Sequence, residues 1–435
     1  MNTEPLWPDD ADSYAADIGP AADLWEARQL LMHVHDFARA RRASPWAVLG
    51  VVLARVAAVT PPRLVLPALV GGQASLNPYV GLVGPAGAGK GAAEAAAADA
   101  VNVGVVETAD LGSGEGLVHL FMRRLKDTEG GGQEQHRTAA LLSVPEIDTL
   151  TALGQRQGAT LMPELRKAFM GERLGFGYVD PKKRLSVGRH AYRLSLVVGI
   201  QPERALALLS DSDAGTPQRF LWLPATDPNA PDVAPAPPRL WTWKAPQWPP
   251  EDFMDPFTDV DVCAAARTLI DSERVRRLRG EGGSLDGHAL LTRLKVAALL
   301  GVLDGRLEAS SSDWQLADVI MRVSDATRSS VSLALRHRSQ RANLARAEKE
   351  GVRAKVVSKK VEEAAVERTA NNIVRKLRER GGSESHGKLR TSLAYRDREH
   401  FEAAIAELKK VKWIRVQSTE YQGQEGERIE LTNSS

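Results

Sequence analysis

The sequence has 435 residues, of which 43% are hydrophobic and 26% are charged, and its formal net charge is +2. This composition is typical of a globular chain with two to four domains and excludes a low-complexity protein. The single cysteine, Cys263, excludes an internal disulfide framework and a cysteine-rich metal site. No run of about 18 uncharged apolar residues occurs, and the acidic N-terminus lacks the features of a signal peptide. We therefore expect a cytoplasmic protein with no membrane partner.

The net charge hides an uneven distribution along the chain. Residues 331–435 carry 23 Lys and Arg against 15 Asp and Glu, a net of +8, and the remaining residues carry 34 against 40, a net of −6. A basic C-terminal quarter indicates a polyanionic partner for that quarter. A solvated helical surface is the alternative interpretation.

Residues 1–62 are expected to form an acidic tail followed by helices. We predict disorder over residues 1–21 and a helical collar over residues 22–62. Two segments with apolar residues three and four apart, LWEARQLLMHVHDFARARR and SPWAVLGVVLARVAAV, indicate two helices. Ser44 and Pro45 suit the N-cap and first turn of the second helix.

Residues 63–225 alternate between short apolar runs and helical segments, which predicts an α/β domain with a mostly parallel sheet. The predicted strands are 79–84, 103–109, 139–144, 192–200 and 219–225. Helical segments lie between them, including SGEGLVHLFMRRLKD after the second strand. An insertion at residues 175–188 predicts a β-hairpin with Lys182, Lys183 and Arg184 at or beside its tip.

The rest of the chain is predicted to contain a linker and two further domains. Residues 226–258 are proline-rich and predict a linker, with Trp241, Trp243 and Trp248 packed onto a domain surface. Residues 259–365 predict a helical domain with a long basic helix. Residues 366–435 predict three helices and a two-stranded wing, the order of a winged helix-turn-helix.

The segment GLVGPAGAGKG after the first apolar strand matches a phosphate-binding loop. Its glycines allow backbone N–H groups to surround a phosphate, and the following helix adds its positive N-terminus. Lys90 would neutralise the terminal phosphates of a nucleotide. The predicted nucleotide-binding residues are Gly84, Pro85, Ala86, Gly87, Ala88, Gly89, Lys90 and Gly91.

Polar residues at the ends of later strands complete a candidate catalytic site. Glu146 follows the strand AALLSV and is placed to act as the catalytic base. Gln201 ends the strand YRLSLVVGI and is a candidate γ-phosphate sensor. Arg219 precedes the last strand, where a guanidinium could reach the phosphate of a neighbouring subunit. A helix-capping acid and a local salt bridge are the alternative interpretations of Glu146 and Arg219.

The series GPAGAGKG, SVPEID, FMGERLGFGYVD, LVVGIQP and GTPQRFL resembles the helicase-type ATPase domain of phage and mobile-element primase–helicase proteins. It is also similar to the ring-forming superfamily III helicases of the AAA+ class. The resemblance covers about residues 25–345 and implies an AAA+-like P-loop core that binds ATP and Mg²⁺. It implies catalysis by Lys90, Glu146, Gln201 and Arg219, a hexameric ring, and a hairpin that grips single-stranded DNA in the central channel.

Two positions depart from the family pattern. Gly91 lacks the hydroxyl, and Pro145 lacks the carboxylate, that together usually hold magnesium. Asp148 or water molecules are the candidate substitutes, because magnesium keeps several waters in protein sites.

The candidate DNA-contacting residues lie in two places. The hairpin residues Lys182, Lys183 and Arg184 would form a cationic collar along a phosphate backbone. In the winged helix, Lys388, Arg390, Arg396 and Arg398 are candidates for duplex binding. The third helix of that module contains four acids, so docking on another protein is the alternative.

The sequence thus predicts an ATP-dependent, ring-forming DNA helicase or translocase that replicates a phage, prophage or integrative element. No paired-carboxylate motif precedes the ATPase core, so we expect a separate primase as a partner. Two other classes of function stay open. One is a non-hydrolysing initiator or helicase loader that assembles on origin DNA, and the other is a DNA-binding regulator or defence component.

Overall fold

The computed structural model describes residues 21–126, 132–154, 159–177, 184–211, 215–250, 256–281, 288–421 and 424–432. The tail predicted over residues 1–21 lies outside these ranges, apart from Ala21 at the start of helix α2. The chain divides into two compact units, residues 1–338 and residues 339–435. Each unit is described by itself below.

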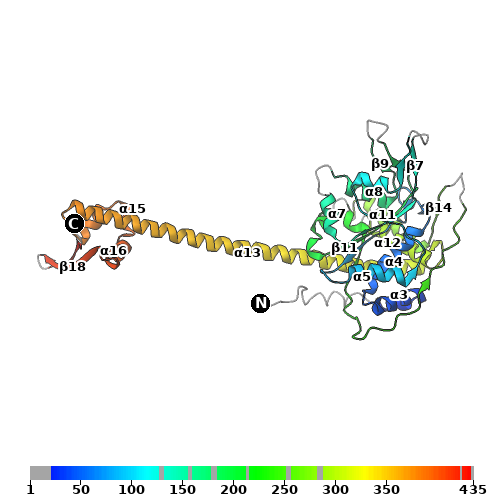
Figure 1. The fold of residues 1–435 in the computed structure, drawn as a ribbon, viewed down its shortest axis with the longest axis horizontal. Coiled ribbons are helices and arrows are strands. Elements are labelled where there is room, and N and C mark those ends of the chain that lie inside the picture. Colours follow the sequence, from blue (N-terminus) through cyan, green and yellow to red (C-terminus); the bar gives the residue numbers. More distant parts are fainter. Residues whose placement is uncertain are drawn as a thin grey trace. The chain divides into compact units, whose positions relative to one another are not determined.

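The first unit is built around a sheet of five parallel strands in the order β12-β3-β11-β8-β5 (Figure 1). The strands are β3 (Tyr79–Val83), β5 (Thr108–Ala109), β8 (Ala139–Val144), β11 (Arg193–Ile200) and β12 (Phe220–Pro224). The parallel α/β prediction is therefore confirmed. The predicted strand 103–109 is shorter than expected and begins at Thr108. Near its predicted start Gly104 adopts a left-handed conformation with φ of +84°, which interrupts the extended backbone there.

The two faces of this sheet bury separate apolar clusters, because successive side chains of a strand point to opposite faces. On one face Leu141 and Val197 pack with helices α4 (Pro45–Val59) and α5 (Lys90–Ala100). On the other face Leu142 and Val198 belong to a second cluster. The helices that contribute to this second cluster include α6 (Gly114–His119), α7 (Ile147–Gly154), α8 (Leu161–Met170) and α9 (Leu206–Ser210). Helix α10 (Thr216–Arg219) directly precedes β12.

Helix α4 packs directly on the sheet and is not part of a separate collar. A side-chain carbon added at Gly50 would lie 2.4 Å from Leu223 Cδ1 on β12 and 2.9 Å from Val80 Cγ1 on β3. Ser44 precedes the helix as predicted, but its hydroxyl donates to the carbonyl of Pro224 instead of capping the helix. Burial between the sheet and the helices α3 (Gln29–Ala40), α5 and α12 (Ala289–Leu303) explains the apolar sequence of α4. Trp25 of α2 (Ala21–Glu26) also packs on Trp46 of α4.

The helix predicted over SGEGLVHLFMRRLKD is wrong beyond its first half. Helix α6 ends at His119, and the chain then forms β6 (Met122–Arg124), which pairs with β7 (Gln133–Gln135) in an antiparallel hairpin. Phe121 is fully buried between these two elements, so its apolar character reflects a buried turn and not a helix face.

The proline-rich segment runs along the first unit as a strap. Its β13 (Trp241–Thr242) pairs with β4 (Val101–Asn102), and β14 (Thr258–Asp259) pairs with β1 (Leu64–Leu66) beside β2 (Ala74–Ser75). The indole N–H of Trp243 donates to the carbonyls of Val302 and Leu303 at 3.3 and 3.0 Å. The prediction that the tryptophans of this segment pack onto a domain surface is confirmed.

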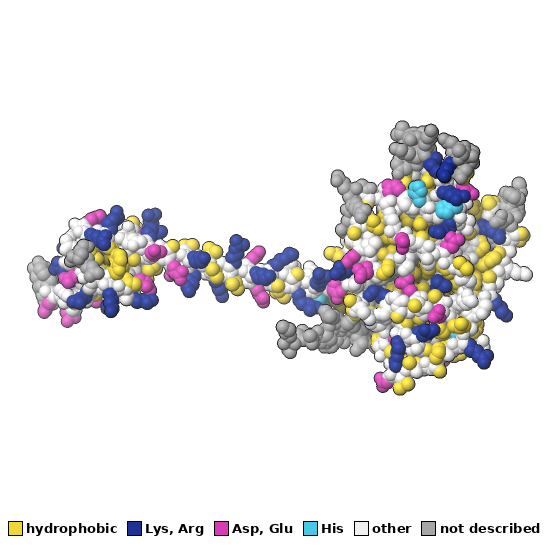
Figure 2. Space-filling model, in the orientation of Figure 1, with side chains coloured by type: hydrophobic (Ala, Val, Ile, Leu, Met, Phe, Trp, Pro, Cys, Tyr) yellow, Lys and Arg dark blue, Asp and Glu magenta, His cyan; other side chains and the backbone are white. Residues whose placement is uncertain are grey.

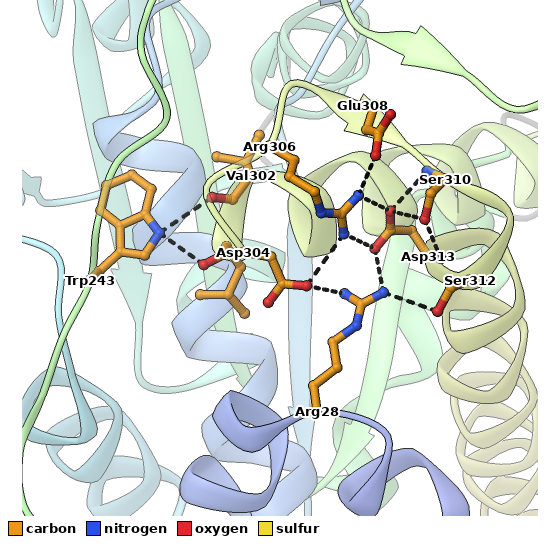
Figure 3. A network of polar contacts seen from close by, with 10 residues as sticks. Arg28, Trp243, Val302, Asp304, Arg306, Glu308, Ser310, Ser312 and Asp313 are labelled. Atoms are coloured by element: carbon orange, nitrogen blue, oxygen red, sulfur yellow. Dashed lines mark hydrogen bonds and ion pairs between the residues drawn. The ribbon is translucent and has the colours of Figure 1, made fainter.

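Helices α11 (Ala264–Leu278) and α12 (Ala289–Leu303) complete the first unit. Strand β15 (Asp261–Val262), before α11, pairs in parallel with β16 (Glu308–Ala309), after α12. An ion-pair network fixes the turn after α12 to the start of α13 (Ser311–Glu379) (Figure 3). In it the buried carboxylate of Asp313 accepts from Arg28 at 2.7 Å and from Arg306 at 2.9 Å. Asp304 pairs with the same two arginines.

The second unit contains the later part of α13, three short helices and an antiparallel sheet in the order β17-β19-β18. Its elements are β17 (Ser383–Ser385), α14 (His386–Ser392), α15 (Tyr395–Arg398), α16 (Phe401–Lys410), β18 (Ile414–Tyr421) and β19 (Gln424–Leu431). Ile373, Leu377, Leu389, Phe401 and Ile429 form its core. Figure 2 shows Lys and Arg side chains spaced along the exposed middle of α13, as the basic sequence predicts.

Candidate functional site

The loop between β3 and α5 forms a cradle of backbone. Gly87 and Gly89 both have φ of +81°, a left-handed conformation that favours glycine, and Gly89 caps α5. The N–H of Gly84 donates to the carbonyl of Ile200 at 3.0 Å, which joins the loop to β11. A side-chain carbon at Gly84 would lie 2.7 Å from Ala88 Cβ, so the loop closes on itself too tightly for a larger residue. This geometry suits an anion bound by N–H groups.

The ammonium of Lys90 lies over this loop. Its Nζ donates to the carbonyls of Gly84 at 2.9 Å and Pro85 at 2.8 Å. Partial burial lowers the pKa of Lys90, and the nearby carboxylates of Glu146 and Glu203 oppose that shift. Lys90 is thus a cation held among backbone carbonyls and acids.

The ends of three adjoining strands bring the other predicted residues to the same edge of the sheet. Strand β11 lies between β3 and β8, with Val198 paired to Val144 on one side and Ile200 paired to Val83 on the other. Gln201 directly follows β11, and Glu146 follows β8 by two residues. The carboxyl ends of parallel strands are where such sheets bind ligands. Glu146 is exposed there.

Glu203 was not among the predicted site residues. It lies in the short 3-10 helix η3 (Pro202–Arg204) directly after Gln201, and it is half-buried near Lys90. In the sequence, Glu203 could have been found only as a glutamate two residues after Gln201, the polar residue that follows β11. Its charge balances that of Lys90 across the loop.

Asp148 is engaged elsewhere. Its carboxylate forms an ion pair with the guanidinium of Arg204. This exposed ion pair joins α7 to the 3-10 helix η3 that follows Gln201. Within the described ranges no group of three His, Cys, Asp or Glu side chains gathers into a metal site.

A further acid, Glu94, lies on α5 about one turn beyond Lys90. The hydroxyl of Ser143 on β8 donates to Glu94 Oε2 at 2.6 Å. Partial burial raises the pKa of Glu94, and the bond from Ser143 opposes that shift. Glu94 lies four residues after Lys90 in an alanine-rich helix, where the sequence gave no signal that it belongs to the site.

The position of Arg219 corrects an expectation. Its side chain is only 7% exposed, and its guanidinium lies 5.9 Å from the ring centroid of Phe169. Helix α12 covers this region, with Thr292 Oγ1 donating to the carbonyl of Gln218 at 2.8 Å. A residue enclosed in this way does not extend toward a neighbouring subunit, because α8 and α12 occupy the space around it.

The predicted hairpin is present in its arms, as β9 (Leu174–Gly175) paired with β10 (Ser186–Val187). Lys182 and Lys183 lie outside the described residues, and Arg184 lies just before β10. The guanidinium of Arg124, on the β6–β7 hairpin, donates to the carbonyl of Arg184 at 2.7 Å. Gln133 adds two bonds to the backbone of Ser186. Two hairpins far apart in the sequence therefore form one projection.

The basic residues predicted in the C-terminal unit differ in their surroundings. Lys388, Arg390 and Arg396 are exposed. Arg398 instead donates to the carbonyls of Leu393 at 3.0 Å and Thr391 at 2.7 Å, so it fixes the end of α14. That role corrects its assignment as a DNA contact.

Exposed acids lie on this unit beside its exposed basic residues. Glu402 and Glu407 are exposed on α16, and Glu420 is paired with Glu425 across the β18–β19 hairpin. Figure 2 shows acidic side chains near the end of that hairpin. Like charges in directly opposed positions destabilise a hairpin, and both acids repel phosphate.

The chain matches no model of a known protein family, and a search of curated proteins finds no relative. None of the described helices is both long and apolar enough to cross a membrane. The functional argument therefore depends on the site itself.

Proposed function

We propose that this protein is an ATP-dependent, ring-forming DNA helicase or translocase that serves the replication of a phage, prophage or integrative element. The observation that carries the proposal is the meeting of Lys90, Glu146 and Gln201 at one edge of three adjoining parallel strands. The strand order, with the sensor strand between the loop strand and the acid strand, agrees with an AAA+ ATPase core and supports the proposal.

Each residue has a distinct task in this proposal. The N–H groups of the loop bind the triphosphate, and Lys90 moves from the carbonyls of Gly84 and Pro85 to the β- and γ-phosphates. Glu146 orients the attacking water, and Gln201 contacts the γ-phosphate. Bound magnesium would neutralise charge on the phosphates. The glycine cradle fits a nucleotide, since a side-chain carbon at Gly91 would meet no atom within 4 Å.

Nucleotide titration and turnover assays test this assignment. We expect Lys90→Ala to lose ATP binding, measured by calorimetry, with an unchanged melting temperature. Glu146→Gln should bind ATP but hydrolyse it about 10²- to 10⁴-fold more slowly, the usual contribution of general base catalysis. If neither the wild type nor any variant gives heat with a nucleoside triphosphate, with or without divalent cations, the proposal is wrong.

Equal and negligible turnover in wild type and Glu146→Gln, with ATP binding intact, would instead identify a non-hydrolysing initiator or loader. The specific observation that favours this second candidate is the absence of the usual magnesium ligands at Gly91 and Pro145. Tight operator-like duplex binding without unwinding would favour the regulator class.

The paired hairpins are the proposed contact with single-stranded DNA. Arg184 and the adjoining Lys182 and Lys183 supply cations at one hairpin, and the bond from Arg124 braces it against the other. Replacing all three cations by alanine should reduce the slope of log affinity against log salt by about 2, because each single-strand phosphate contact contributes about 0.7. The control is Arg274→Ala with Arg276→Ala, two exposed cations on α11. An unchanged slope would exclude the hairpin as the contact.

Ring assembly in this proposal does not use Arg219. We expect ATPγS to convert the protein from a small species to a closed oligomer, observed by sedimentation velocity and negative-stain imaging with forked DNA. A monomer under all these conditions would remove the ring from the proposal.

For the C-terminal unit, the strand order and the three helices agree with a winged helix. The acids of α16 and of the β18–β19 hairpin favour docking on a basic protein surface, such as that of a separate primase, over insertion into duplex DNA. Replacing Lys388, Arg390 and Arg396 by alanine tests the alternative, in which this unit binds duplex DNA. A tenfold loss of duplex affinity would show that these residues contact DNA, and an unchanged affinity would support docking on a protein.

A further inference from the structure

Helix α5 and strand β8 face each other along a seam that begins at the phosphate loop. Residues 141, 143 and 145 share one face of β8 and its extension, because side chains alternate along a strand. Leu141 and Ala97 are buried in the same cluster, so this face of β8 is the one turned toward α5. The bond from Ser143 to Glu94, at 2.6 Å, is the next layer toward the loop.

Gly91 and Pro145 belong to the outermost layer of this seam. Gly91 lies three residues before Glu94 on α5, and Pro145 lies two residues after Ser143. Both are exposed, and a side-chain carbon at Gly91 would meet no atom within 4 Å. The two positions that usually supply magnesium ligands are therefore open, and the nearest inner layer holds a carboxylate and a hydroxyl.

We propose that Glu94, oriented by Ser143, supplies the carboxylate that holds magnesium when Mg²⁺–ATP binds, in place of the ligands missing at Gly91 and Pro145. The inference rests on the proposed nucleotide site. Three residues of α-helix span about 4.5 Å along the axis, a distance that a magnesium-bound water can bridge, so Glu94 can hold the metal through water while its Oε2 keeps the bond from Ser143. Glu94 can therefore reach the outer layer through that water without a change in the helix.

The other acids near the loop are occupied by other tasks. Asp148 pairs with Arg204, Glu203 lies near Lys90, and Glu146 stands in the position of the base. One carboxylate is sufficient for this metal, because Mg²⁺ in nucleotide sites keeps several waters and takes only one or two protein carboxylates along with the phosphates. Ser143 is a positioning residue, since its hydroxyl bonds the carboxylate from the strand side.

The test compares ATPγS affinity in excess EDTA and in excess MgCl₂, by calorimetry on the full chain. For the wild type we expect Mg²⁺ to strengthen binding. Glu94→Gln should lose about tenfold or more of that gain, the usual cost of disturbing a metal site, and should keep its affinity in EDTA. Ser143→Ala should lose a smaller part. Asp99→Asn, an exposed acid on the same helix, is the matched control and should keep the gain.

A restoring variant separates a metal ligand from a merely structural bond. Gly91→Thr supplies the missing hydroxyl, and in the Glu94→Gln background it should recover most of the Mg²⁺-dependent gain. If Glu94→Gln keeps the full Mg²⁺-dependent increase in ATPγS affinity, the inference is wrong. It is also wrong if ATPγS binding to the wild type depends on Lys90 but not on Mg²⁺. Absence of any ATPγS binding in the wild type would be a failure of the proposed function itself, which is a different result.

Discussion

Gly199 on β11 faces the carbonyl of Pro145 so closely that a side-chain carbon at residue 199 would lie 2.0 Å from that oxygen. The same added carbon would lie 3.5 Å from Lys90 Cδ. The missing side chain of Gly199 thus lets the acid-bearing loop, the sensor strand and the loop lysine meet. Proline at residue 145 completes this contact through its backbone and not through a side chain.

Gly199→Ala is therefore expected to push Pro145 and Glu146 away from the loop. Overpacking of this kind costs about 1–3 kcal/mol of unfolding free energy, and it should also weaken ATPγS binding. Gly112→Ala, outside the phosphate loop, is the control, because its added carbon would meet open space. Thermal denaturation and calorimetry measure the two effects. Equal melting temperatures for the two variants would contradict the close contact.

Arg219→Ala is expected to destabilise the first unit. The guanidinium is enclosed near Phe169 and beneath α12, so truncation removes packing and leaves a cavity. We expect a loss of about 2–3 kcal/mol in unfolding free energy, measured by denaturant titration at a concentration where the protein is monomeric. An arginine that acts only between subunits would leave monomer stability unchanged. An unchanged stability of Arg219→Ala would therefore support a role for Arg219 at the subunit interface.

Acidification should destabilise the first unit through His190. Burial lowers the pKa of His190 to about 4, and the cations Arg189, Arg193 and Lys295 add to the shift. Between pH 6.5 and 4 the unfolded chain binds a proton that the folded chain does not, so stability falls as the pH decreases through this window. The full effect is roughly 3 kcal/mol.

Denaturant titrations of the wild type and of His190→Gln across this window measure the effect. The variant is expected to be less stable at pH 7, since it loses the bond between His190 Nδ1 and Ser75 Oγ of 2.8 Å, and to show a smaller pH slope. His136→Gln changes an exposed histidine and should keep the wild-type slope. Identical slopes in all three proteins would contradict the prediction.

The network in Figure 3 predicts unequal roles for two neighbouring acids. Burial would raise the pKa of Asp313, but bonds from Arg306, Ser310 and Arg28 outweigh it and lower that pKa. Asp313→Asn leaves the arginines without their buried counter-charge and should cost about 3–5 kcal/mol. Asp304→Asn, at a partly exposed carboxylate, should cost about 1 kcal/mol or less. Similar melting temperatures for the two variants would show that burial does not set these contributions.

The sequence by itself determined the local features of the site. Gly87, Gly89 and Lys90 could be assigned because a phosphate loop is a continuous segment whose backbone needs glycine at left-handed positions. Four of the five strands were placed well for a similar reason, since buried parallel strands are short apolar runs. The antiparallel arms of the 175–188 hairpin also followed from local turn residues.

Only the tertiary structure decided which distant residues meet. Ser143 and Glu94 are 49 residues apart, and nothing local links them. Arg219 looked like an exposed cation until Phe169 and α12 were found around it. Helix α4 looked like a separate collar because its apolar sequence does not say which surface it covers. A short sequence motif fixes backbone conformation, whereas burial and pairing depend on the packing of segments that are far apart in the chain.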